Sequence, residues 1–109
     1  MSDVIERVFG VIQDRRNADP SVSYVASLQQ AGLNKILEKV GEEACEVAIA
    51  AKDAATSKST SEVVKETADL WFHSLILLDH LGETPDNIFA ELENRFGTSG
   101  ITEKQSRKN

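Results

Sequence analysis

The sequence is poor in the residues that build disulfide frameworks and sheets. It has one cysteine, two prolines and six glycines in 109 residues, and its aromatic residues amount to 6%. One cysteine excludes an internal disulfide and indicates a cytoplasmic protein. Low glycine, proline and aromatic content favours helices over a sandwich or barrel. Because no apolar run approaches the ~18 residues of a membrane span, we expect neither a span nor a signal peptide.

Metal-binding side chains other than carboxylates are also scarce. One cysteine and two histidines are too few for a closed Cys/His zinc site, and Cys45 is interpreted as a small buried residue. The net charge of −6 argues against a general nucleic-acid binder. If four carboxylates belong to a metal site, 14 acids face 12 bases, so that most of the acidity is local.

Apolar residues recur at helical spacing through most of the chain. Ser23 is a predicted N-cap, and Thr84 followed by Pro85 indicates another helix start. We expect an all-α single domain over residues 1–109, an antiparallel bundle of about four to five helices, with a polar, partly flexible tail at 97–109. The helices are expected at 3–16, 24–30, 33–52, 62–81 and 85–96, the last with Ile88, Phe89, Leu92 and Phe96 buried. The fourth helix is apolar nearly all round, which indicates that it is buried nearly all round and that the chain self-associates.

Two acidic motifs dominate the helical region, EACE at 43–46 and ETAD at 66–69. Residues three apart share a helix face. An antiparallel hairpin turning near Thr56 would bring all four carboxylates to one level. Such a cluster is unstable unless its pKa values rise or a cation enters, and Mg²⁺ suits oxygen ligands. We therefore predict a magnesium site with the ligands Glu43, Glu46, Glu66 and Asp69. The alternative is two solvated acidic pairs, because most glutamates on helices lie at the surface.

Longer stretches of the sequence resemble a known family. It is similar to the phosphoribosyl-ATP pyrophosphohydrolases, members of the all-α, MazG-like nucleotide pyrophosphohydrolases, whose pattern is ExxE, a spacer and ExxD. The similar stretches are SYVASL at 23–28, KILEKVGEE at 35–43, ADLWFHS at 68–74 and RFGTSG at 95–100.

The resemblance implies a reaction and a set of site residues. The reaction would be the Mg²⁺-dependent hydrolysis of phosphoribosyl-ATP to phosphoribosyl-AMP and pyrophosphate, the second step of histidine biosynthesis, by a stand-alone homodimeric enzyme. Glu43 and Glu46 would be catalytic together with Glu42, although Glu38 is an equal candidate for the general base. Basic residues that could contact phosphate are Lys35, Lys39, Arg95, Lys104 and Arg107. His73 could contact a ligand or could simply be hydrogen-bonded within the helices.

Other functions fit the same residues. A house-cleaning nucleotide pyrophosphohydrolase would share the fold but act on free or damaged nucleotides. A non-enzymatic acidic bundle would serve as an interaction module, without Mg²⁺ dependence. A di-iron bundle is disfavoured because it needs Glu-x-x-His motifs. We expect neither a nucleic-acid polymer nor a membrane as a partner.

Overall fold

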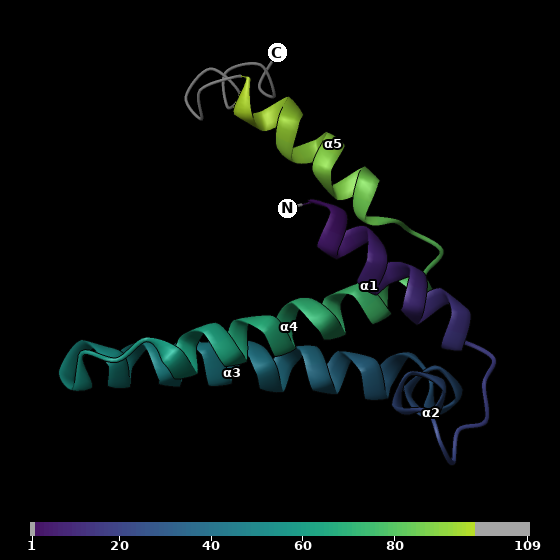
Figure 1. The fold of residues 1–109 in the computed structure, drawn as a ribbon, viewed down its shortest axis with the longest axis horizontal. Coiled ribbons are helices and arrows are strands. Elements are labelled where there is room, and N and C mark those ends of the chain that lie inside the picture. The colour runs from purple at the N-terminus through teal and green to yellow at the C-terminus, as the bar shows by residue number, and fades with distance from the viewer. Residues whose placement is uncertain (1, 98–109) are drawn as a thin grey trace.

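The computed structural model describes residues 2–97, which form five α-helices and no strand, as predicted (Figure 1). Among these helices none is both long and apolar enough to span a bilayer. Ser23 caps the second helix, since its side chain accepts a hydrogen bond of 3.2 Å from the Ala26 N–H. The helices are α1 (Ser2–Arg15), α2 (Tyr24–Ala31), α3 (Leu33–Ser57), α4 (Ser61–His80) and α5 (Pro85–Phe96).

The longest two helices, α3 and α4, lie side by side and antiparallel (Figure 1). The prediction that the third helix ends near residue 52 and turns near Thr56 was wrong. The helix continues to Ser57, and Lys58 ends it in the left-handed conformation, where its N–H donates to the Ala54 carbonyl at 2.9 Å. Residues 53–57 contain neither glycine nor proline, and their alanines favour helix.

The pairing of the two acidic motifs nevertheless has the predicted register. Eleven residues of α3 follow Glu46, whereas only five residues of α4 precede Glu66. The six-residue difference is about 9 Å of helix rise, which three linking residues can span. Glu46 therefore lies beside Glu66 although the turn is displaced.

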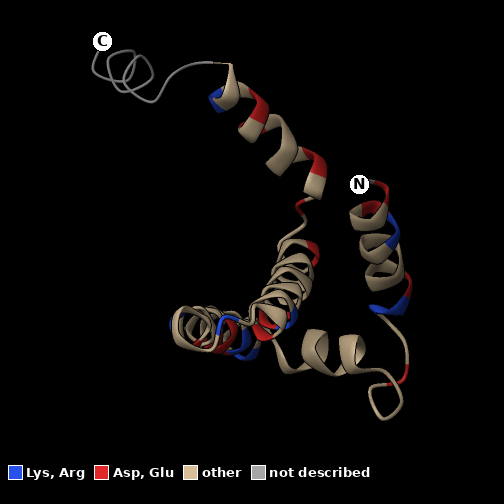
Figure 2. Cartoon of the chain, turned by 60° about the vertical axis from the view of Figure 1, so that its left-hand side comes forward, with Lys and Arg blue, Asp and Glu red and all other residues tan. Residues whose placement is uncertain are grey.

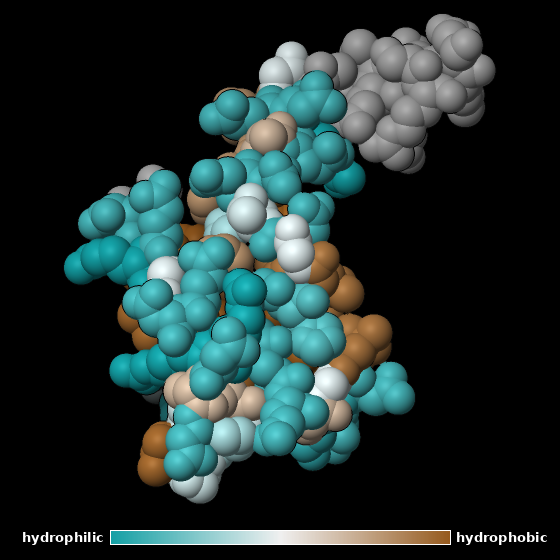
Figure 3. Space-filling view, turned by 90° about the vertical axis from the view of Figure 1, so that its right-hand side faces the viewer, coloured by the Kyte–Doolittle hydropathy of each residue, from teal (hydrophilic) through white to brown (hydrophobic). Residues whose placement is uncertain are grey.

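The buried core lies where α1 and α2 pack against the α3–α4 pair. Ile12, Ile36 and Ile76 are fully buried, one each from α1, α3 and α4. Hydrophilic side chains cover most of the surface at this end, with apolar side chains at its edges (Figure 3). The core is thus small and local, and it fixes the end of the α3–α4 pair that α1 and α2 cover. Phe9, Val25, Leu28 and Leu75 complete the core.

Several apolar faces that we predicted to be buried are exposed in the single chain. Helix α5 packs against α1 and stands apart from α3 and α4 (Figures 1 and 2). Its Phe96 is 93% exposed, and Trp71 of α4 is 58% exposed. Cys45 is also exposed, contrary to prediction. Periodicity identified these amphipathic faces correctly but could not say what covers them. The other large apolar side chains exposed on these faces are Ile49, Val64, Ile88 and Leu92.

Candidate metal centre

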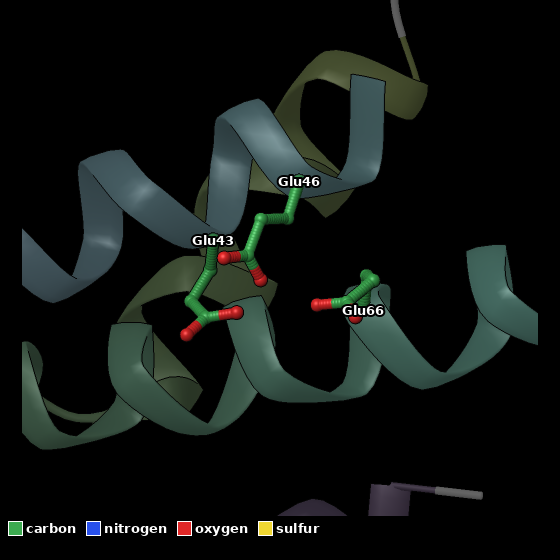
Figure 4. Close-up of side chains that lie close together, drawn as sticks. All are labelled: Glu43, Glu46 and Glu66. Atoms are coloured by element: carbon green, nitrogen blue, oxygen red, sulfur yellow. The ribbon is translucent and has the colours of Figure 1, made fainter. Parts of the chain in front are cut away.

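Three of the four predicted ligands converge between α3 and α4 (Figure 4). Glu43 and Glu46 come from consecutive turns of α3, and Glu66 comes from α4. Each residue offers a carboxylate oxygen, and these oxygens lie within 4.8 Å of one another. Glu43 is buried, with 6% of its surface exposed, whereas Glu66 is half-buried and Glu46 is exposed. The group is therefore closed on one side and open to solvent on the other.

Two oxygens of this group lack hydrogen-bond partners. Within residues 2–97, Oε2 of Glu43 and Oε2 of Glu66 are buried side-chain atoms to which no donor is hydrogen-bonded. Leaving a buried polar atom unpaired costs about 1–3 kcal/mol, and more for a charged group. A divalent cation with oxygen ligands would satisfy both atoms, so the residues fit such an ion.

Two glutamates of this group, Glu43 and Glu66, have raised pKa values. Burial raises the pKa of Glu43, and the neighbouring charges of Glu46 and Asp69 add to this effect. The chance to share a proton with the neighbouring carboxyl of Glu46 is the largest cause that raises the pKa of Glu66, followed by burial and by the nearby acids. Without a cation, the group therefore takes up protons more readily than isolated glutamates would.

The fourth predicted ligand, Asp69, lies near the group but is not one of its three members. It is half-buried, one turn after Glu66 on α4. Its charge contributes to the raised pKa of both Glu43 and Glu66. Its role as a ligand stays a prediction.

Basic residues flank the metal centre on the α2 side. Lys39 Nζ lies 3.2 Å from a carboxylate oxygen of Glu42 and 3.9 Å from one of Glu43. One turn earlier, Lys35 pairs with Glu38 at 3.4 Å. Lys39 is thus the predicted phosphate contact that adjoins the metal centre.

The other predicted phosphate contacts do not gather there. Arg95 pairs with Glu91 on α5 at 3.0 Å, and α5 packs against α1. Lys104 and Arg107 lie outside the described residues. A phosphate contact by any of these three residues stays a prediction.

Beyond Asp69, a hydrogen bond joins α2 to α4. His73 Nδ1 lies 2.9 Å from the Asp69 backbone carbonyl, which can only accept, so Nδ1 carries the proton. In the neutral ring, Nε2 then accepts from the Tyr24 hydroxyl at 2.7 Å. The sequence marked Tyr24 only as part of a family-like stretch and did not indicate this contact.

A second polar network, near the far end of α4, was missed altogether. Asp79 is buried, and its carboxylate accepts hydrogen bonds from the Arg16 guanidinium and from the Gln29 side-chain amide. The Arg16 Nε lies 3.0 Å from the carboxylate and the Gln29 Nε2 lies 2.9 Å from it. The side-chain amide oxygen of Gln29 in turn lies 2.8 Å from Nδ1 of His80, which is hydrogen-bonded to it. No sequence signal connects groups that lie 50–63 positions apart.

The fold and the site define a class of helical proteins in which carboxylates from two adjacent helices converge where a divalent cation could be held. The model of the family phosphoribosyl-ATP pyrophosphohydrolase matches residues 6–96, a range that contains both acidic motifs. The chain belongs to this family and is a hydrolase of the phosphoribosyl-ATP pyrophosphohydrolase type. The family resemblance seen in the sequence is thereby confirmed.

Proposed function

We propose that this chain hydrolyses phosphoribosyl-ATP to phosphoribosyl-AMP and pyrophosphate in a Mg²⁺-dependent reaction, as a step of histidine biosynthesis in the cytoplasm. The family match supports the reaction. The observation that carries the metal dependence is the pair of buried, unpartnered oxygens on Glu43 and Glu66. Without a cation, burying both oxygens with no hydrogen-bond partner would cost folding free energy that nothing offsets.

In this proposal Glu43, Glu46 and Glu66 hold the cation, and Asp69 supplies a further oxygen from α4. Bound Mg²⁺ would supply Lewis-acid chemistry to the phosphates and would lower the pKa of a coordinated water. Lys39 adjoins Glu43 and contacts the phosphate chain from the α2 side.

The general base is proposed to be Glu42. Its partner Lys39 also reaches Glu43, whereas the partner of Glu38 is Lys35, one turn further away. Glu42 is therefore the better placed of the two candidates to take a proton at the edge of the metal centre.

The experiment is a pyrophosphate-release assay with phosphoribosyl-ATP, with and without Mg²⁺, run beside ATP and other nucleoside triphosphates. We expect Mg²⁺-dependent release from phosphoribosyl-ATP and little from the others. Preference for plain triphosphates would favour the house-cleaning alternative. Hydrolysis of neither substrate would favour the non-enzymatic one.

We also propose that the enzyme is a homodimer. Val64 is 66% exposed and Trp71 58% on the same helix, and such large apolar surfaces are uncommon in isolated chains. Sedimentation should give twice the chain mass of 12.0 kDa. A Trp71→Glu variant should shift towards the monomer, whereas Glu93→Gln on the surface of α5 should not. A monomeric unaltered chain would contradict the proposal.

A further inference from the structure

A pocket adjoins the metal centre on the side of the turn between α3 and α4. Its volume is about 270 Å³, just below the roughly 300 Å³ at which typical small-molecule sites begin. Glu46 and Glu66 contribute to its lining, so the pocket and the metal centre share two side chains. Whatever molecule is held by the cation therefore has this pocket within its reach.

The lining of the pocket combines an apolar surface with negative charge. Ile49, Ala50 and Ala54 of α3 supply the apolar part. Asp53 of α3 and Glu62 of α4 add two carboxylates beyond the pair shared with the metal centre. Among the described residues, no lysine, arginine or histidine lines it. The pocket thus suits a flat apolar group that carries positive charge.

The phosphates of the substrate do not suit this lining. Four carboxylates repel an anion, and a bound divalent cation offsets at most two of these charges. Lys39, the basic residue next to Glu43, stands on the opposite side of the metal centre, towards α2 and Tyr24. The triphosphate would therefore lie on the Lys39 side, and the base is the uncharged or cationic part of the substrate that suits the pocket.

The base of phosphoribosyl-ATP differs electrically from that of ATP. The second ribose is attached to N1 of the adenine ring. Substitution at N1 makes the ring a much stronger base, because its protonated form shares the charge over N1, C6 and the exocyclic nitrogen. The ring of phosphoribosyl-ATP is thus largely cationic near neutral pH, whereas the adenine of ATP is neutral.

We propose that Asp53 and Glu62 are specificity-determining residues that bind the cationic, N1-substituted adenine of phosphoribosyl-ATP and thereby discriminate against ATP. The apolar surface of Ile49 and Ala54 packs against the ring, and the two carboxylates face its positive charge. This inference rests on the proposed function for the identity of the substrate. The pocket and its charge stand independently of it.

A binding experiment with nucleosides tests the pocket without catalysis. The probes are 1-methyladenosine, which carries the same positive charge, and adenosine, which does not. We expect the unaltered protein with Mg²⁺ to bind 1-methyladenosine about tenfold more tightly, as two partly exposed charge pairs allow. The Asp53→Asn/Glu62→Gln double variant should lose this preference. The matched control is Asp14→Asn/Glu93→Gln, which removes the same charge from exposed positions on α1 and α5 and should keep it. Equal binding of the two nucleosides by the unaltered protein, or a preference that survives in the double variant, would overturn the proposal.

Steady-state kinetics then separate this inference from the proposed function. In the double variant, KM for phosphoribosyl-ATP should rise about tenfold with little change in kcat, and raising the pH until the ring loses its proton should erase the difference from the unaltered protein. Turnover by the unaltered protein with an unchanged KM in the variant would contradict the inference alone. Absence of turnover by the unaltered protein would contradict the proposed function. The nucleoside binding experiment would still test whether the pocket prefers a cationic base.

Discussion

Two buried acids in this chain have opposite surroundings. Asp79 is 6% exposed and receives hydrogen bonds from Arg16 and Gln29. Glu43 is 6% exposed, its Oε2 has no hydrogen-bond partner among the described residues, and its nearest neighbours include two further acids. Lys39 approaches only its other oxygen, at 3.9 Å.

The difference distinguishes a structural carboxylate from one arranged for a ligand. A buried charge that is paired and hydrogen-bonded is tolerated, and it holds α1 and α2 to the end of α4. A buried carboxylate among like charges is unstable alone and becomes favourable only when a cation or a proton arrives. Substitutions at the two places should therefore differ in kind: one set should affect activity and the other stability.

The largest effect is expected for Glu46→Gln, which keeps the shape of the side chain and removes its charge. Losing an outer partner of a metal ligand typically costs about 10–100-fold, so removing a ligand should lower turnover by more than about 100-fold. Circular dichroism should show an intact helical fold. Asp79→Asn is the contrasting variant, and its turnover per folded molecule should stay close to that of the unaltered protein. Full activity of Glu46→Gln would remove Glu46 from the mechanism.

The next largest effect is expected for Arg16→Gln, measured by urea unfolding. This change leaves Asp79 buried without its cation and should destabilise the fold by about 3 kcal/mol. Asp79→Asn should cost less than half as much, because the Arg16 side chain is 45% exposed and can return to water. Equal losses for the two variants would contradict the view that burial of the carboxylate dominates.

Adding Mg²⁺ should stabilise the protein through the metal centre. At ten times its Kd, a ligand that binds only the folded state contributes about 1.4 kcal/mol, which corresponds to a rise in Tm of several degrees. The rise should vanish in Glu46→Gln and persist in Asp79→Asn. A rise of the same size in all three proteins would indicate a general salt effect instead.

The smallest effect is the pH dependence of the metal-free protein. Folding raises the pKa of Glu43 and Glu66, so the folded state binds more protons than the unfolded state above the ordinary glutamate value of 4.5. The free energy of unfolding should therefore fall as the pH rises from about 4.5 towards neutrality. Glu43→Gln/Glu66→Gln should flatten this slope, whereas the exposed control Asp14→Asn/Glu93→Gln should not. A slope that stays unchanged in the first variant would contradict the raised pKa values.

An interaction could be predicted from the sequence when its residues are close together along the chain. The register of the two acidic motifs follows from helix geometry over some twenty residues, and the structure brings Glu43, Glu46 and Glu66 together as predicted. The end of α3 was misplaced because it depends on Lys58 adopting a left-handed conformation, which residue type does not favour.

Contacts between distant parts of the chain left no signal in the sequence. Arg16 and Asp79 are 63 positions apart, and either alone looks like an ordinary surface charge. The apolar face of α5 was recognised as amphipathic, but which helices pack against this face, and hence the exposure of Phe96, is not revealed by periodicity.

The most direct measurement of the central claim is a crystal grown with Mn²⁺ in place of Mg²⁺ and examined for anomalous scattering. An ion should lie between α3 and α4, about 2.0–2.6 Å from oxygens of Glu43, Glu46 and Glu66. The contradictory result is a site without an ion, in which the buried oxygens of Glu43 and Glu66 are hydrogen-bonded to ordered water.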